Sequence, residues 1–250
     1  MQKPFFAFFL LAALVLFFGC IQQSEKGELT ELEGPAMEKV SFQTNDGVTI
    51  AANFFSPKKS NGKAVILLHM MPAVKESWNA FAKKLTEKGF TVIAPDLRGH
   101  GESNKKGNEV LDFQKFSDKE HKESIQDVYA SMSFLEEKGF QKENTFIIGA
   151  SIGANLALQF AAENPEIKRT ALLSPGLDYR GVNAEKFIEK FKGSLFIASS
   201  KEDAYSYSSS ETLAKKSANA VNKQYNNAGH GTTMFNSTDL MNELLEWIAK

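Results

Sequence analysis

From residue 38 onward, short apolar runs rich in β-branched residues alternate with helical patterns of ten to twenty residues. The run Ala64-Val65-Ile66-Leu67-Leu68 is apolar at every position, as expected for a strand that is buried on both faces. Strands and helices that alternate at these lengths predict an α/β fold, with a mostly parallel central sheet and helices on both faces. No internal repeat or low-complexity tract interrupts the pattern.

The expected elements follow this alternation. An opening antiparallel hairpin is predicted because Asn45-Asp46-Gly47 suits a tight turn between two apolar runs. Only about twenty residues, 175–194, separate the two strands that could flank a lid, so any cap is expected to be minimal. We expect strands at residues 40–44, 48–55, 64–69, 91–95, 145–148, 171–174, 195–199 and 222–225, and helices at residues 76–88, 119–138, 152–163, 211–218 and 239–249.

The first 19 residues form a separate segment. Lys3 is followed by the uncharged apolar run from Phe5 to Phe18 and then by Gly19-Cys20, an order typical of a secretory signal. The segment resembles a lipoprotein signal, in which cleavage before the cysteine leaves a thiol that carries a diacylglycerol anchor. That resemblance implies lipidation of Cys20, the only cysteine in the chain.

An uncleaved anchor is the main alternative for this segment. The uncharged stretch from Pro4 to Gln23 approaches the roughly 20 residues that span a bilayer. Either outcome predicts an extracytoplasmic protein held at the cell membrane; a plain signal is a third possibility. We expect residues 1–19 to be the signal segment, residues 20–37 the anchor cysteine and a polar, flexible tether, and residues 38–250 the folded domain.

Charge and cysteine content exclude two classes of protein. The formal net charge of −1 supplies no basic field for nucleic acid, so a nucleic-acid partner is not expected. A single cysteine permits neither an intramolecular disulfide nor a cysteine-rich metal site. No metal ion or organic cofactor is implied, and the oligomeric state is left open.

The segment Gly149-Ala150-Ser151-Ile152-Gly153 lies between an apolar run and an alanine-rich helical pattern. A G-x-S-x-G turn needs small residues because the chain reverses sharply, which lifts the serine oxygen above the sheet. The unpaired N–H groups at the start of the following helix face the same place and favour negative charge there. Ser151 is therefore the candidate nucleophile, and the amide of Ile152 a candidate oxyanion donor.

A serine hydroxyl needs a base, and that base needs an orienting acid. His230 follows the last expected strand among glycines, and Asp203 follows the strand before it, so both lie at the same sheet edge as Ser151. Glu202 and Asp178 are alternative acids. The chain order Ser151, Asp203, His230 is the order associated with α/β-hydrolases.

The sequence resembles the α/β-hydrolase superfamily over residues 38–250, through the segments 96–103, 149–153 and 228–231. The minimal cap and residues 69–78 are similar to the dienelactone-hydrolase and small-esterase branches. The resemblance implies a second oxyanion amide at Met70, where the family often has glycine and where a methionine side chain would narrow the acyl pocket. His69 is expected to brace that loop.

The remaining residues of interest are expected to have structural roles. Asp96 should organise its own loop by accepting backbone N–H groups, and His100 should be structural. His121 lies on a charged helical pattern and is expected to be solvated. Trp78, Phe81 and Leu85, spaced three and four apart, should form the core face of a helix.

Together these observations predict a serine hydrolase that cleaves carboxylic esters or thioesters of small to medium acyl groups. Serine aminopeptidase-like peptide hydrolysis is an alternative on the same fold. A hydrolytic dehalogenase is disfavoured because Ser151 occupies the turn where its nucleophile would be a carboxylate. A surface binding protein without turnover is the alternative from a different class.

Overall fold

The computed structural model describes Met1 and residues 36–250. Residues 2–35, which include Cys20 and most of the expected signal and tether, lie outside the described part, so the predictions made for them stay predictions. Among the described residues, no helix has both the length and the apolar character to cross a bilayer. The first strand begins at Ala36, two residues before the expected domain boundary.

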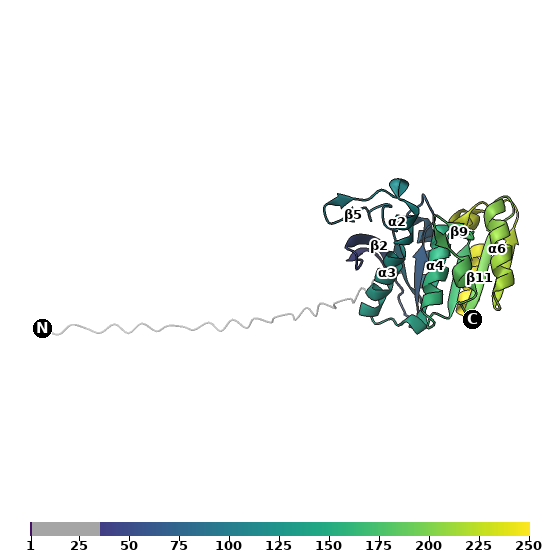
Figure 1. The fold of residues 1–250 in the computed structure, drawn as a ribbon. Helices are drawn as coiled ribbons and strands as arrows, with labels where there is room; N and C mark the ends of the chain where they lie inside the picture. The colour runs from purple at the N-terminus through teal and green to yellow at the C-terminus, as the bar shows by residue number, and fades with distance from the viewer. Residues whose placement is uncertain (2–35) are drawn as a thin grey trace, which may run out of the picture. The chain divides into compact units, whose positions relative to one another are not determined.

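A mixed, mostly parallel sheet forms the centre of the domain, with strand order β12-β11-β8-β7-β3-β4-β2-β5-β6 and β1 paired to β2 (Figure 1). The strands from β12 to β4 are parallel, and β2 is antiparallel to β1, β4 and β5. The sheet strands are β1 (Ala36–Gln43), β2 (Val48–Ser56), β3 (Ala64–Leu68), β4 (Thr91–Pro95), β5 (Lys105–Lys106), β6 (Glu109–Val110), β7 (Thr145–Ala150), β8 (Arg169–Leu173), β11 (Ser194–Ser200) and β12 (Ala220–Tyr225).

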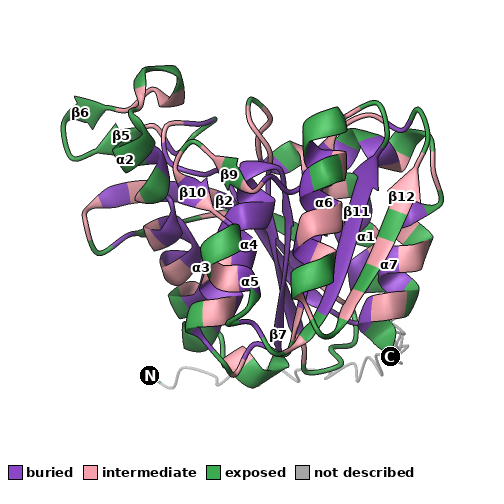
Figure 2. Ribbon diagram, turned by 45° about the vertical axis from the view of Figure 1, so that its right-hand side comes forward, coloured by how far each residue is buried: buried purple, intermediate pink, exposed green. Residues whose placement is uncertain are grey.

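The α/β expectation is confirmed, as is the opening hairpin between β1 and β2, where Thr44 N–H bonds to Val48 O at 2.9 Å. Helices cover both faces of the sheet (Figure 2). The described helices are α1 (Asn79–Glu87), α2 (Asp118–Lys122), α3 (Ile125–Glu137), α4 (Ile152–Glu163), α5 (Glu185–Ile188), α6 (Ala204–Lys216) and α7 (Leu240–Ala249), with 3₁₀ turns η1 (Lys75–Trp78), η2 (Phe113–Lys115), η3 (Lys142–Asn144) and η4 (Gly231–Asn236).

The alternation of side chains along β3 explains the two cores. Ile66 and Leu68 pack in one apolar cluster with α3 and α4, whereas Val65 and Leu67 pack in a second cluster with α1 and α7. All of these side chains are fully buried. Burial of each aliphatic side chain of this size stabilises the folded state by about 1.5–3 kcal/mol. A strand that is buried on both faces therefore stabilises the fold from both sides of the sheet. The expected core residues Trp78, Phe81 and Leu85 belong to the second cluster.

Two expected helices differ in extent. The single helix expected at residues 119–138 is wrong: α2 ends at Lys122 and α3 begins at Ile125, and α2 starts at a capping box between Ser117 and Glu120. The helix expected at 211–218 begins earlier, at Ala204, because the Asp203 side chain accepts the Ser206 N–H and caps it. Periodicity alone showed neither cap.

Two segments, called excursions below, leave the carboxyl ends of the parallel strands β8 and β4. The first follows β8 and contains the hairpin of β9 (Asp178–Tyr179) and β10 (Val182–Asn183), followed by α5. The second, which the sequence did not indicate as a cap, follows β4 and contains β5, β6, η2 and α2. They touch at the hairpin tip, where a Cβ on Gly181 would lie 3.1 Å from that of Asp118.

The position of His121 contradicts the sequence prediction. His121 lies on α2 and is 4% exposed rather than solvated. Its ring packs edge-on against Phe116, with ring centroids 5.5 Å apart. The charged neighbours that suggested a solvated face are themselves exposed, so one turn of α2 has a buried side that is too short to show a periodic pattern.

Candidate active site

Four of the sequence-predicted site residues follow the carboxyl ends of parallel strands. Met70 comes after β3, Ser151 after β7, Asp203 after β11 and His230 after β12. The carboxyl ends of parallel strands meet at one edge of a sheet, where open α/β sheets bind their ligands. The topology therefore gathers residues that are far apart in the sequence.

Ser151 sits in a strained turn at the start of α4. Its backbone has φ 54° and ψ −122°, outside the regions that residues with a side chain normally adopt. A Cβ on Gly149 would collide with the backbone of Gly153, so the turn requires glycine at that position. The Ser151 N–H is fixed by a 2.8 Å bond to Leu173 O of β8. This turn places the Ser151 side chain at the N-terminus of α4.

Asp203 and His230 are in direct contact. His230 Nδ1 lies 2.6 Å from Asp203 Oδ2, and the two side chains are 36% and 18% exposed. The other carboxylate oxygen, Oδ1, accepts the Ser206 N–H at 3.4 Å. One carboxylate thus orients the imidazole and is itself held by the helix that it caps.

The two alternative acids are engaged elsewhere. Glu202 accepts the backbone N–H of Gly229 at 2.6 Å and of Asn227 at 2.8 Å. The bond from Gly229 is the main reason that the pKa of Glu202 is lowered to about 2. Asp178 accepts the Gly181 N–H at 2.7 Å within the β9–β10 hairpin. Glu202 therefore positions the loop that carries His230, a role that sequence reasoning did not assign.

Two consecutive residues at the end of β8, Leu173 and Ser174, hydrogen bond with Ser151 and with the loop that carries His230. Leu173 O accepts the Ser151 N–H, and the next side chain, Ser174, accepts the Gly231 N–H at 2.9 Å. Within residues 36–250, no direct hydrogen bond joins the Ser151 hydroxyl to the His230 ring. Catalytic hydrogen bonds are often long without substrate and shorten when it binds.

Tyr179, on β9, is a site residue that sequence reasoning missed. Its hydroxyl hydrogen bonds with Ser206 Oγ at 2.7 Å and donates to Ser174 O at 3.4 Å, and it lies close enough to the Ser151 side chain for that hydroxyl to influence its pKa. Its ring lies edge-on to that of His230, with centroids 6.4 Å apart. Burial raises the pKa of Tyr179 to about 12, so it is a neutral donor at ordinary pH. An isolated aromatic residue in a short excursion carries no pattern that would have identified it.

The two candidate oxyanion amides lie where β3 meets α4. A Cβ on Gly153 would lie 2.5 Å from Leu68 O and 2.6 Å from His69 O, so α4 begins directly against the end of β3. In the described part of the chain, neither the Met70 N–H nor the Ile152 N–H donates a hydrogen bond. Both donors are therefore available to a ligand.

His69 braces the Met70 loop, as expected. Its Nε2 accepts the Leu97 N–H at 2.9 Å, which leaves the proton on Nδ1 to be donated to Met70 O at 2.9 Å. Complete burial lowers the pKa of His69, which keeps the ring neutral for this pair of bonds. The loop after β3 is thereby tied to the loop after β4.

Asp96 and His100 also have the structural roles that were expected. Asp96, fully buried, accepts the backbone N–H of Lys75 at 2.8 Å and of Glu102 at 2.9 Å, and pairs with Lys75 Nζ at 2.7 Å. His100 stacks on Phe113 with ring centroids 3.8 Å apart. These contacts hold the second excursion against the sheet.

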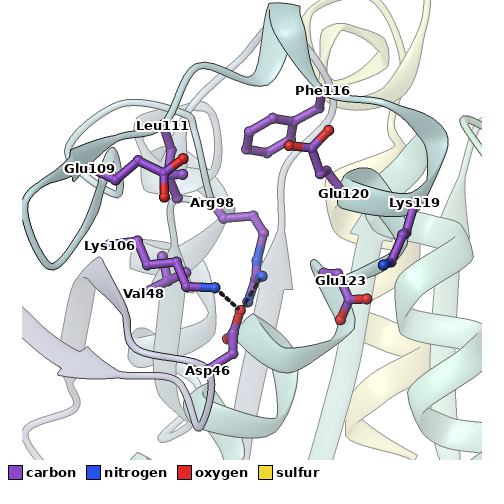
Figure 3. Close-up of a pocket in the computed structure, with 10 residues that line it drawn as sticks. All are labelled: Asp46, Val48, Arg98, Lys106, Glu109, Leu111, Phe116, Lys119, Glu120 and Glu123. Atoms are coloured by element: carbon purple, nitrogen blue, oxygen red, sulfur yellow. Dashed lines mark hydrogen bonds and ion pairs between the residues drawn. The ribbon is translucent and has the colours of Figure 1, made fainter.

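A cavity of about 420 Å³ beside the second excursion does not include the site (Figure 3). Three of its charged groups are held in ion pairs: Arg98 pairs with Asp46 at 2.8 Å and with Asp127, outside the lining, at 2.8 Å, and Lys106 also pairs with Asp46 at 3.3 Å. None of Ser151, Asp203 and His230 lines it. Its ion pairs join the β1–β2 turn to the excursion.

A serine in a strained strand-to-helix turn, followed along the chain by an acid and a histidine on later strand ends, defines the α/β-hydrolase fold. The family described as alpha/beta hydrolase fold matches residues 63–233, and the chain belongs to this family.

Individual relatives are more distant. An uncharacterised protein of Mycobacterium tuberculosis is 32% identical over 124 residues, which are 49% of this chain and 32% of that protein. The chain thus spans about a third of the length of the first curated relatives that it matches. An esterase of Pyrococcus furiosus has a similar structure, with a TM-score of 0.68, 16% identity and coverage of 86% of this chain and 91% of the esterase. A dienelactone hydrolase of Anabaena variabilis gives a TM-score of 0.68 at 16% identity, with 86% and 96% covered.

Proposed function

We propose that this protein is a serine hydrolase that cleaves carboxylic esters or thioesters. The observation that carries the proposal is the 2.6 Å contact between His230 Nδ1 and Asp203 Oδ2 at the sheet edge that also holds Ser151 in its strained turn. Removal of the hydroxyl proton is what makes a serine nucleophilic, and an oriented imidazole is the group that removes it.

The reaction follows from these positions. The Ser151 Oγ bonds to the substrate carbonyl carbon while its proton passes to His230 Nε2. The N–H groups of Met70 and Ile152 bind the oxygen that becomes negative. Collapse of this intermediate breaks the bond to the leaving alcohol or thiol, which takes the proton from His230. Water, deprotonated by His230, then releases the acyl group and restores Ser151.

The acyl group is proposed to be small or medium in size. The structurally similar proteins include an esterase and a dienelactone hydrolase, which supports ester chemistry without defining a substrate. Met70 supports a narrow pocket, because a Cβ on Gly231 would lie 2.6 Å from Met70 Sδ. The methionine side chain therefore lies against the loop of His230.

The test combines a covalent probe with substrates. The full-length protein is incubated with a fluorophosphonate and its intact mass measured, and a p-nitrophenyl ester series of increasing chain length is assayed in parallel. We expect one adduct on Ser151, lost in Ser151→Ala and retained in the exposed control Ser208→Ala. An adduct without ester turnover would favour the peptidase alternative. Folded protein that forms no adduct would favour a binding protein.

We also propose that the domain is held at the outer face of the cell membrane, through lipidated Cys20 or an uncleaved N-terminal segment. The support is the sequence pattern of residues 3–20. Intact mass of protein extracted from membranes distinguishes the two forms. Lipidation predicts a mature chain that starts at Cys20 with added acyl mass, and Cys20→Ser should abolish that processing. An unprocessed mass in the wild type would exclude lipidation.

A further inference from the structure

A second cavity, of about 290 Å³, lies where the two excursions meet. Its volume is close to the lower end of the range of about 300–1,000 Å³ typical of small-molecule sites. Apolar surface comes from Met71, Pro72, Phe113 and Phe116, and polar groups come from Gln114, His121 and Arg180.

Two residues that line this cavity are chain neighbours of residues at the candidate active site. Met71 directly follows Met70, whose amide is a proposed oxyanion donor. Arg180 directly follows Tyr179, whose ring lies edge-on to that of His230 with centroids 6.4 Å apart. A substrate whose carbonyl lies between the Ser151 hydroxyl and the Met70 amide can therefore extend into the cavity.

The polar lining of the cavity lacks partners. His121 is 4% exposed, and among the described residues neither of its ring nitrogens has a hydrogen-bond partner. Burial, and then the positive charge of Arg180, lower its pKa, so the ring is a neutral imidazole. Neither nitrogen is fully enclosed by protein, so the imidazole can hydrogen bond with a ligand in the cavity. Arg180 is exposed and forms no ion pair with any described residue.

The backbone at Arg180 adopts a strained conformation. Arg180 and Gly181 form the two-residue turn between β9 and β10, with φ of 51° and 79°. A turn with positive φ at both positions favours asparagine and glycine, so an arginine at the first position is strained. Strain of this kind is concentrated at functional sites.

The charge of the residues that line the cavity indicates the charge of the ligand that it can bind. Arg180 is the one charged residue among the seven described residues that line this cavity, and none of them is a carboxylate. The cavity of Figure 3, in contrast, is lined by carboxylates that accompany its basic groups. A guanidinium donates two parallel hydrogen bonds to a carboxylate, and the imidazole N–H can supply another.

We propose that the substrate of this hydrolase carries a carboxylate in addition to its ester, and that Arg180 and His121 bind that carboxylate in this cavity. The inference rests on the proposed serine hydrolase function for the reacting end of the substrate. Phe113 and Phe116 then contact the short carbon chain between the carboxylate and the ester.

The kinetic test compares charged and neutral esters on the full-length protein. p-Nitrophenyl hydrogen glutarate places the carboxylate on the acyl side, 4-(pentanoyloxy)benzoate places it on the leaving group, and p-nitrophenyl valerate is the neutral match. Arg180→Gln should lower kcat/KM about tenfold for one of the charged esters, or about 1.4 kcal/mol, and leave the valerate ester within twofold. Arg180→Lys should restore part of the loss. The matched control Lys186→Gln removes an exposed charge from the same excursion and should change none of the three.

Equal effects of Arg180→Gln on charged and neutral esters would overturn the proposal, as would no effect on any. A binding measurement separates this outcome from failure of the catalytic assignment. Titration calorimetry of glutarate into Ser151→Ala protein should show binding that Arg180→Gln or His121→Phe removes, and absence of binding would refute the carboxylate site. Absence of a fluorophosphonate adduct in the wild type would refute the catalytic proposal instead.

Discussion

Asp203 contacts His230 with one carboxylate oxygen, 2.6 Å from Nδ1, and caps helix α6 with the other. The acid is therefore fixed to an element of 13 residues rather than to a mobile loop. Because the cap and the imidazole use different oxygens, neither bond competes with the other. An imidazole held in this way has its remaining nitrogen free for the Ser151 proton.

Asp203→Asn should lower kcat by a factor of about 10³–10⁴ and leave the protein folded. Asparagine keeps a cap oxygen, but it no longer offers a carboxylate to hold the imidazole proton on Nδ1 or to stabilise the imidazolium. Ester turnover and thermal unfolding of the same sample check both parts. A variant with near wild-type turnover would exclude Asp203 as the acid.

Glu202→Gln should have a smaller effect on kcat, about tenfold. The glutamate holds Gly229 and Asn227 by their backbone N–H groups, and a neutral amide offers only one oxygen for them. The His230 loop should therefore lose order without losing its acid. Kinetics of Glu202→Gln beside Asp203→Asn compare the two carboxylates. A larger loss in Glu202→Gln would reverse their assignments.

The lowered pKa of Glu202 predicts how its stabilising effect depends on pH. The folded pKa is about 2 and the ordinary value is 4.5, so folding favours the ionised form. The stabilisation is complete above about pH 4.5 and is lost as the pH falls toward 2. Urea midpoints of wild type and Glu202→Gln should therefore converge over this window. Midpoints that stay a constant distance apart from pH 6 to pH 2 would contradict the assigned bonds.

The main outline of the fold could be predicted from the sequence because it depends on strong patterns. Strands buried on both faces, such as β3, are apolar throughout, and α4 was located from Ile152 to Glu163 as the structure has it. The boundaries that failed depend on single side chains: Asp203 extends α6 toward its N-terminus, and Ser117 with Glu120 starts a short α2. A cap acts through geometry, which periodicity does not record.

The site was partly predictable for a similar reason. Ser151, Asp203 and His230 each follow a strand, and parallel topology gathers strand ends. Tyr179 reaches the site from an excursion with no comparable rule, and the buried side of His121 is created by the β9–β10 hairpin packing against α2. Contacts between two irregular segments are set by tertiary packing, so the sequence pattern of either segment does not show them.

Tyr179→Phe should separate two effects of the tyrosine hydroxyl. Loss of its bond to Ser206, a fully buried residue, should lower the free energy of unfolding by about 1–3 kcal/mol. The change also removes a hydroxyl close to the Ser151 side chain, which leaves Ser151 freer to turn toward His230, so fluorophosphonate labelling should become about two- to threefold faster. Denaturant unfolding and labelling rates measure the two effects. Labelling slowed more than tenfold would show that the tyrosine hydroxyl assists the reaction.

Gly153→Ala should destabilise the protein and reduce turnover, although alanine is favoured over glycine in a helix by about 1 kcal/mol. The added Cβ would lie 2.5 Å from Leu68 O and 2.6 Å from His69 O. These are backbone atoms of a buried strand end, so they cannot move aside as a flexible side chain would, and the clash outweighs the propensity gain. The start of α4, with Ser151 and the Ile152 amide, must then shift away from Met70.

The labelling rate and the free energy of unfolding of Gly153→Ala should both fall. The control Gly62→Ala, where the added Cβ meets no neighbour within 4 Å, should leave labelling unchanged. A stabilised and fully reactive Gly153→Ala would show that α4 does not start as closely against β3 as this geometry requires.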